Sequence, residues 1–380
     1  MAEHIFTNAR IVTAEQVIDG TLVVENNLIK SVETGHCSAP SAHDCEGRYI
    51  IPGMVELHTD NMERHLKPRP KSYWPTDSAI MNHDREIAGA GITTVFNALY
   101  VGDSNDDGRS PDTTRDACDA VRQARDTGHL KVDHLLHLRC EVSVGKLLDF
   151  LNPLLDNELA QLISVMDHTP GQRQFVSLEA YATYYQGKYN LNDAEFARFI
   201  QDKTEQQKLY SEPNRRAVVK IAHEHDIHLA SHDDATVAHV DEAIEDGVSI
   251  AEFPTTIEAA RASHNAGLAV LMGGPNLVRG KSHSGNASAR DFADLGLLDI
   301  ISSDYVPASM LHAALAMEHH LDSVELPDAI NMVSKTPAEH VGLTDRGELT
   351  PGKLADLVVF RRDDDLPIID QVWRQGGRIA

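Results

Sequence analysis

Residues 52–60 read PGMVELHTD and mark the point where the pattern of the sequence changes from short β-rich segments to alternating strands and helices. A Pro-Gly pair breaks the chain, an apolar run follows, and the run closes on His58 and Asp60. Because alternate residues of a strand share a face, these two side chains point to the same side. Beyond this stretch, apolar runs that end in polar residues alternate with helical patterns, which is typical of parallel βαβ units.

Eight such runs occur, the number that a closed parallel barrel needs. We expect strands at Met54–Asp60, Ile92–Asn97, His134–Glu141, Leu162–His168, Ile227–Asp233, Val248–Thr255, Leu268–Asn276 and Leu297–Tyr305. We expect helices at Pro111–Thr127, Asp193–Lys208, Glu212–Glu224, Ala235–Asp246, Thr256–Ala266 and Ser288–Leu295. Pro111 and Pro213 suit the first turns of two of these helices. The predicted fold class is α/β, with a (β/α)₈ barrel of the TIM type.

Both ends of the chain carry short β-rich segments. Before the barrel, Asp19-Gly20 and Asn26-Asn27 separate runs that are rich in β-branched residues. After the barrel, residues 355–360 and 368–373 return to the same pattern. We therefore expect a small β-sandwich formed from both termini, residues 1–51 and 347–380, beside a hydrolase barrel over residues 52–346.

The chain is acidic, with 58 Asp and Glu against 34 Lys and Arg and a formal net charge of -24. This balance argues against nucleic acid or an anionic membrane as the main partner. The four cysteines show no C-x-x-C spacing, and neither a signal-type segment nor an apolar run of about 18 residues occurs. These features predict a cytoplasmic protein without a membrane span. The sequence does not determine the oligomeric state, and a homo-oligomer is compatible with it.

Imidazoles and carboxylates close most of the predicted strands. The candidates are His58, Asp60, Glu141, His168, His232, Asp233, Glu252 and Asp304. Side chains at the carboxyl ends of barrel strands converge on one site, and mixed nitrogen and oxygen ligands suit zinc, manganese or a similar divalent ion. A carboxylate beside water bound to such an ion fits a general base, the role that we expect for Asp304.

Each of these positions also has an ordinary structural interpretation. Asp233 or Asp234 fits a cap for the following helix, and Asp304 fits a buried carboxylate paired to a histidine. A hydrogen-bonded histidine explains His168 nearly as well as a ligand does, and a solvated strand end explains Glu141 equally well. Only the cluster of protonatable groups around His232, which is costly without a counter-cation, favours a ligand role.

Basic residues are few, and they gather in loops after the predicted strands. The candidates for substrate binding are Arg69, Lys71, Arg173, Lys188, Arg279, Lys281 and His283. Gly-rich loops with lysine and arginine suit phosphate groups, so we expect a phosphorylated small molecule as substrate; the alternative is solvated loop charge. The sequence contains neither a G-x-G-x-x-G fingerprint nor a G-x-S-x-G elbow, so dinucleotide binding and serine hydrolysis lack support.

Three stretches are similar to motifs of the amidohydrolase superfamily. They are residues 52–58 (PGMVELH), 91–95 (GITTV) and 352–359 (GKLADLVV). Further runs, residues 137–141 (HLRCE) and 166–175 (MDHTPGQRQF), resemble superfamily members that act on a ribosyl triphosphate in phosphonate catabolism by the carbon–phosphorus lyase pathway. The resemblance covers nearly the whole chain. It implies a metal-bearing barrel in which water attacks a phosphorus of a 5-triphosphate and pyrophosphate leaves.

The resemblance also implies roles for individual residues. It implies that the metal ligands are His58, Asp60, Glu141 and His232, and that Asp304 is the acid–base residue. His168 and Glu252 lie at strand ends where other members of the superfamily place ligands, so either residue would complete a second site. Asp60 replaces the second histidine of the common H-x-H start of the superfamily. The resemblance is therefore compatible with one bound ion or two, and with zinc or manganese. The rival expectations are another amidohydrolase reaction, either deacylation or deamination, and a scaffold barrel that has lost its metals.

Overall fold

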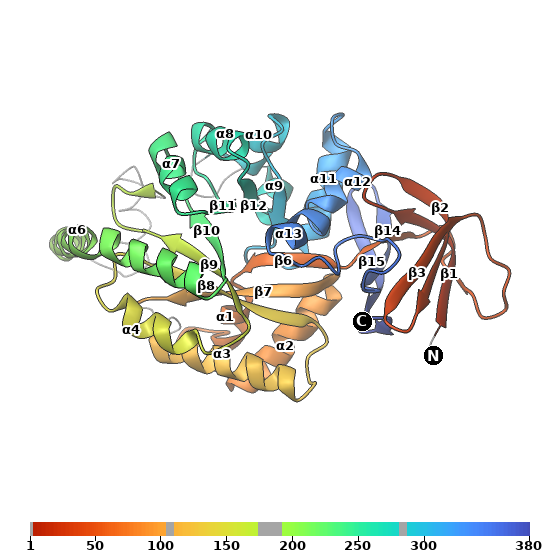
Figure 1. The fold of residues 1–380 in the computed structure, drawn as a ribbon, viewed down its shortest axis with the longest axis horizontal. Helices are drawn as coiled ribbons and strands as arrows, with labels where there is room; N and C mark the ends of the chain where they lie inside the picture. The colour runs from red at the N-terminus through yellow and green to blue at the C-terminus, as the bar shows by residue number, and fades with distance from the viewer. Residues whose placement is uncertain (1–2, 104–109, 174–191, 281–286) are drawn as a thin grey trace.

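The structure is a computed structural model, and it describes residues 3–103, 110–173, 192–280 and 287–380. Two sheets of eight strands each make up the framework. In Figure 1 one sheet lies at the end of the molecule where both termini are found, and the other lies among most of the helices. The second sheet positions the candidate site.

The second sheet is parallel throughout and nearly closed. Its strands are β6 (Met54–Thr59), β7 (Ile92–Val101), β8 (Asp133–Glu141), β9 (Ala160–Met166), β10 (His228–His232), β11 (Ile250–Glu252), β12 (Ala269–Gly273) and β13 (Ile300–Ser302), in this spatial order. A parallel bridge between Thr59 and Asp304 joins the two ends of the row. All six residues of β6 are buried, as expected for a strand that is covered on both faces. The prediction of a TIM-type barrel is confirmed at this level.

The first sheet combines strands from both ends of the chain. It contains β1 (Glu3–Val12), β2 (Val17–Glu25), β3 (Leu28–Thr34), β4 (His43–Asp44), β5 (Tyr49–Pro52), β14 (Leu357–Asp363), β15 (Leu366–Arg374) and β16 (Gly377–Arg378). The predicted turn at Asn26 separates β2 from β3, and its φ of 60° is a left-handed value that asparagine tolerates. One buried apolar cluster includes Val12 and Val358 from this sheet together with Met54 and Ile92 from the barrel, so the two sheets share a core.

Helices cover the barrel between its strands. They are α1 (Asn61–Leu66), α2 (Thr76–Gly89), α3 (Pro111–Asp126), α4 (Leu147–Leu151), α6 (Asp193–Glu224), α7 (Val237–Glu245), α8 (Ile257–Asn265), α9 (Gly274–Arg279), α10 (Ala289–Asp294), α11 (Ser309–His320), α12 (Leu326–Asn331) and α13 (Lys335–His340), with a 3₁₀ turn at Asn152–Leu154. Thr236 and Thr256 cap α7 and α8 by accepting a backbone N–H in the first turn. Among the described residues, none of the helices combines the length and apolar character needed to cross a membrane.

Several predicted elements have different bounds in the structure, including the strands β11 and β13, which are shorter than expected. The expected helices Asp193–Lys208 and Glu212–Glu224 form the single helix α6, with Pro213 in its interior rather than in a first turn. The proline removes one helical donor, and the residue whose carbonyl loses this donor, Leu209, is 65% exposed, so the interruption lies in an exposed part of the helix. The expected strand Leu268–Asn276 ends at Gly273, because Pro275 lies in the first turn of α9.

Candidate metal centre

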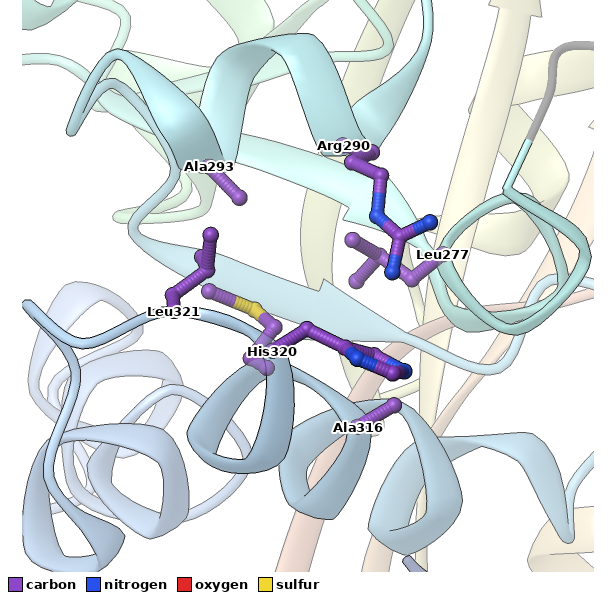
Figure 2. Close-up of a pocket in the computed structure, with 7 residues that line it drawn as sticks. Leu277, Arg290, Ala293, Ala316, His320 and Leu321 are labelled. Atoms are coloured by element: carbon purple, nitrogen blue, oxygen red, sulfur yellow. The ribbon is translucent and has the colours of Figure 1, made fainter.

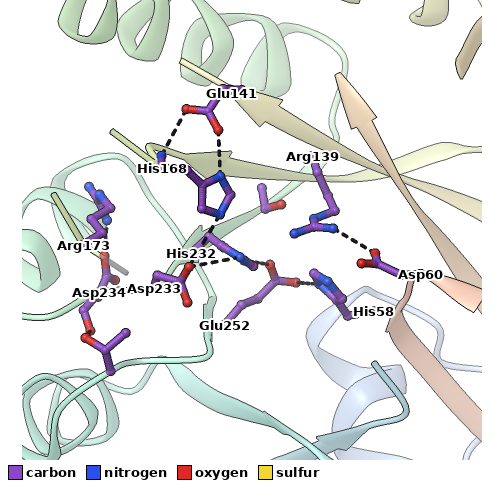
Figure 3. Close-up of polar contacts among 12 residues, drawn as sticks. His58, Asp60, Arg139, Glu141, His168, Arg173, His232, Asp233, Asp234 and Glu252 are labelled. Carbon is purple, nitrogen blue, oxygen red and sulfur yellow. Dashed lines mark hydrogen bonds and ion pairs between the residues drawn. The ribbon is translucent and has the colours of Figure 1, made fainter. Parts of the chain in front are cut away.

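Glu252 lies at the centre of the first ligand group, at the end of β11. Its Oε1 is 3.1 Å from Nδ1 of His58, and its Oε2 is 3.1 Å from Nδ1 of His232 (Figure 3). His232 and Glu252 are register partners on the neighbouring strands β10 and β11, while His58 reaches them from β6. All three side chains are buried, and one ligand atom of each lies within 4.8 Å of the others.

The charge state of Glu252 fixes the orientation of both rings. Burial would raise the pKa of Glu252, but the neighbouring rings of His137, His58 and His232 outweigh burial and hold it well below its usual value. An ionised carboxylate only accepts hydrogen bonds, so each facing Nδ1 donates its proton to Glu252, which makes Nε2 the ligand nitrogen of each ring when the ring is neutral. This arrangement is typical of histidines that bind a metal through Nε2 and a carboxylate through Nδ1.

A second ligand group lies on the other side of His232. Nε2 of His168 and Nε2 of His232 lie 3.6 Å and 3.4 Å from Oδ2 of Asp233. This buried carboxylate oxygen accepts no hydrogen bond from the described residues. Two ligands bound at about 2.1 Å to a tetrahedral ion are about 3.4 Å apart, so the three atoms fit the spacing around one cation.

Glu141 supports the second group from behind. Its Oε2 is 2.7 Å from Nδ1 of His168, and its Oε1 accepts the His168 backbone N–H at 3.1 Å. Burial opposes protonation of His168, but Glu141 and Asp233 outweigh burial and raise the pKa of this ring to about 9. The carboxylates around His168 therefore attract positive charge strongly. In the structure Glu141 contacts the histidine rather than joining either ligand group.

Three residues at the strand exits adopt left-handed backbone conformations. Asp233, Phe253 and Asp304 have φ values of 59°, 52° and 55°. Such values are rare for residues other than glycine and concentrate at functional sites. The ring of Phe253 packs edge-on against His58 and His232, with centroids 4.8 Å and 5.5 Å away. These turns direct side chains toward the barrel mouth.

Comparison with known proteins places this site in a family. The chain is 44% identical over 376 residues to the alpha-D-ribose 1-methylphosphonate 5-triphosphate diphosphatase of Escherichia coli (strain K12), covering 99% of this chain and 100% of that protein. Residues 209–379 match the family model described as the amidohydrolase family. The chain belongs to the amidohydrolase family.

Solved structures agree with this assignment at the level of the fold. A 5-methylcytosine deaminase from Klebsiella pneumoniae superposes on this amidohydrolase with a TM-score of 0.69 and 14% identity, over 99% of this chain and 97% of that chain. An N-acetylglucosamine-6-phosphate deacetylase from Pasteurella multocida gives a TM-score of 0.64 and 15% identity over 100% of both chains. These structures show that the overall fold is shared.

Asp304 of the amidohydrolase joins the site through its backbone. Its N–H donates to the carbonyl of His58 at 3.1 Å, and its own carbonyl accepts from the Asp60 N–H at 2.7 Å. The Asp304 carboxylate lies close to Gly273, where a Cβ would be in ordinary van der Waals contact with Oδ2 at 3.4 Å. The predicted base thus lies beside the first strand, whose His58 belongs to the first ligand group.

Asp60 has a partner that the sequence did not indicate. NH1 of Arg139, on β8, donates to Oδ1 of Asp60 at 2.8 Å. Asp60 belongs to neither ligand group. The signal was present in the sequence, because Arg139 shares the period-two face of His137 and Glu141 in the run at residues 137–141.

Glu56 is a second residue that sequence reasoning missed. Its fully buried carboxylate accepts the backbone N–H of His58 at 2.6 Å and that of Ser303 at 2.5 Å. Burial raises the pKa of Glu56 to about 7, against these hydrogen bonds, which lower it. The signal for this role was a lone acid inside the otherwise apolar run before His58. Through these two hydrogen bonds Glu56 connects β6 to the turn that carries Asp304.

The predicted phosphate-binding residues have different environments. Arg173 is buried and forms ion pairs with Asp234 and Glu242, so its charge is already neutralised. Arg69 and Lys71 are exposed in the loop after α1, and Arg279 is exposed at the end of α9. The remaining candidates, Lys188, Lys281 and His283, lie outside the described residues.

A cavity between α9, α10 and α11 does not suit the substrate. It is lined mainly by apolar side chains, with Arg290 and His320 on its rim (Figure 2). Its volume of about 10 Å³ has room for about one water. The ligand groups at the strand ends are therefore the better candidate for chemistry.

Proposed function

We propose that this amidohydrolase hydrolyses alpha-D-ribose 1-methylphosphonate 5-triphosphate to the 5-phosphate and pyrophosphate in phosphonate catabolism. The observation that carries the proposal is the 44% identity to the Escherichia coli diphosphatase over the full length of both chains. The connected cluster of imidazoles and carboxylates at the strand ends supports it, because a triphosphate near so many acids needs cations between them.

Metal binding at these residues is part of the proposal. His168, His232 and Asp233 would hold one divalent ion. Glu252, predicted as a ligand, would instead orient His58 and His232 through their Nδ1 atoms, which leaves Nε2 of His58 as the ligand atom of a second position. Zinc and manganese both suit this donor set. A divalent ion here supplies an electrophile and lowers the pKa of water toward neutrality. Of the ligands predicted from sequence, Glu141 and Asp60 have the weaker support, since each faces another side chain.

The protein's own groups would carry the rest of the reaction. The oxygen of water bonds to a phosphorus of the α–β anhydride, the bond from that phosphorus to the bridging oxygen breaks, and Asp304 accepts a proton from the water. We assign Arg69, Lys71 and Arg279 to the outer oxygens of the phosphate chain, together with Lys188, Lys281 and His283. Arg173, buried with its two acids, would orient the loop after β9 rather than bind phosphate directly.

The wider setting is also a proposal. We infer a cytoplasmic enzyme that acts on a small molecule, and we leave homo-oligomerisation open. We propose that residues 1–51 and 347–380 form the β module and that residues 52–346 form the catalytic barrel.

Phosphorus NMR of the products tests the function directly. The protein is incubated with the ribosyl triphosphate, first with manganese or zinc and then with a chelator. We expect pyrophosphate and the 5-phosphate in equal amounts, and only with metal. Release of orthophosphate alone would contradict the proposal. Turnover of acylated or aminated substrates without attack on the triphosphate would favour deacylation or deamination instead.

A further inference from the structure

Arg139 is a cationic side chain inside the group of carboxylates that surrounds the ligand atoms. It lies on β8 two residues before Glu141, so both side chains leave the strand on the same face. Figure 3 shows its guanidinium between Asp60 and the rings of His58 and His232. Its side chain is 8% exposed and that of Asp60 is 23% exposed, so the pair is largely buried but retains access to solvent.

The position of Arg139 is costly for a residue with only a structural task. A buried guanidinium must be paired, and here it also lies among residues that are expected to hold a metal cation. A pairing partner for Asp60 alone would not need to be placed beside the ligand atoms.

The chemistry of guanidinium explains the placement. Its planar fork of N–H donors matches the oxygens of a phosphoryl group, which a point charge does not. In phosphoryl transfer, charge spreads over the non-bridging oxygens of the reacting phosphorus, and fixed donors that face them stabilise the transition state. Arg173, which was predicted to bind phosphate, is already paired with two acids and is less free to bind a phosphoryl group.

We propose that Arg139 binds the non-bridging oxygens of the reacting phosphoryl group, and that Asp60 orients this guanidinium. The proposal rests on the proposed hydrolysis of a triphosphate. The proposal gives Asp60 a different role from the second histidine of the H-x-H motif. An H-x-H pair supplies two imidazoles, whereas the H-x-D pair at the end of β6 supplies one imidazole, His58, and one carboxylate that orients an arginine. The site would thus combine bound metal ions with a positive charge on the protein itself, the Arg139 guanidinium.

Variants of the pair test this role through turnover, metal content and phosphate binding. The set is Arg139→Lys, Arg139→Gln and Asp60→Asn, with Arg115→Gln on the outer helix α3 as the matched control. Turnover is measured with the ribosyl triphosphate, metal content by elemental analysis, and affinity by calorimetry with inorganic tripolyphosphate on the manganese-loaded protein. Thermal unfolding confirms that each variant is folded.

We expect Arg139→Lys to lose roughly 100-fold or more in kcat, since a lysine keeps the charge but not the fork. Arg139→Gln should also weaken tripolyphosphate binding at least about 10-fold, with the metal content unchanged in both variants. Asp60→Asn should keep its metal and lose less activity than Arg139→Gln. Arg115→Gln should match the wild type.

Three outcomes would overturn the role of Arg139. They are full kcat in Arg139→Lys, unchanged tripolyphosphate affinity in Arg139→Gln, and loss of metal from Asp60→Asn in proportion to its loss of activity. The binding measurement also separates this proposal from the proposed function. If the wild type fails to hydrolyse the triphosphate, the proposed substrate is wrong, yet a difference in tripolyphosphate affinity between wild type and Arg139→Gln still supports phosphoryl binding.

Discussion

His232 and Glu252 face each other from neighbouring parallel strands, with Nδ1 of the histidine 3.1 Å from Oε2 of the glutamate. The two residues are paired in register, so the sheet itself sets their separation. The same carboxylate reaches His58 through its other oxygen. One buried glutamate therefore fixes the orientation of two imidazoles from opposite parts of the chain.

The first prediction concerns Glu252→Gln. The amide has the shape of the carboxylate but no charge and only one acceptor oxygen, so one of the two rings loses its acceptor and its fixed tautomer. We expect metal affinity to fall about 10- to 100-fold, the usual cost of losing such a partner. Competition with a chromogenic chelator measures this affinity. Glu258→Gln, on the exposed face of α8, is the control and should bind metal like the wild type.

Asp233, which the sequence left open between a site residue and a helix cap, lies in the second ligand group in the structure. Asp233→Asn should reduce the amount of metal that copurifies with the protein and lower kcat by about 100-fold or more, because the second ligand group loses its only negative donor. Asp234→Asn is the neighbouring comparison, since Asp234 pairs with Arg173 instead. Equal metal content in wild type and Asp233→Asn would restrict Asp233 to a helix-capping or hydrogen-bonding role.

Asp304→Asn tests the predicted base. The backbone hydrogen bonds of this residue survive the change, so the fold and the metal content should be unaffected. Loss of a general base costs typically 100- to 10,000-fold in rate, and we expect kcat to fall within about that range. Stopped assays with the triphosphate at saturating concentration check this. A variant with wild-type kcat would show that water loses its proton to another group.

Acid stability should report a buried histidine outside the metal centre. His83 lies on α2 between Asn61 and Asn97, and burial, followed by repulsion from His134, lowers its pKa to about 3. The unfolded state then binds one more proton than the folded state between about pH 6.5 and pH 3. The free energy of unfolding should therefore fall with decreasing pH in this window, by about 1.4 kcal/mol per pH unit from this group.

The measurement is urea unfolding between pH 7 and pH 4.5, before other groups dominate. His83→Gln keeps a polar side chain but cannot titrate, so its stability should depend less steeply on pH. His223→Gln, at the last turn of α6, is the exposed comparison and should keep the wild-type slope. Parallel slopes for all three proteins would mean that His83 does not titrate as its burial implies.

The sequence predicted most of the barrel for clear physical reasons. Each strand is an apolar run closed by a polar residue, and each exit lies at the same mouth, so His58, His232 and Glu252 could be grouped before any distance was known. The break expected at Pro213 was wrong, because α6 continues through the proline at an exposed part of the helix, where Leu209 loses one donor. Local sequence patterns do not contain that information.

Pairings between distant strands were beyond the sequence. The alternation that picks out His58 and Asp60 also picks out Arg139 and Glu141, but it does not show which cation faces which acid. The structure pairs Asp60 with Arg139 and Glu141 with His168. Arg173 is similar: a basic residue in a loop suggested phosphate, whereas the fold places two acids around it.

The hydrogen bond from the Ser303 backbone to Glu56 joins residues 247 positions apart and closes the barrel seam beside His58. During synthesis, a nascent chain emerging from the ribosome carries His58 long before Ser303 has been made. The site therefore assembles only near the end of translation, when the last strand docks against the first. Until then, the early histidines and acids lack the frame that fixes their spacing, so the complete ligand geometry exists only in the folded barrel.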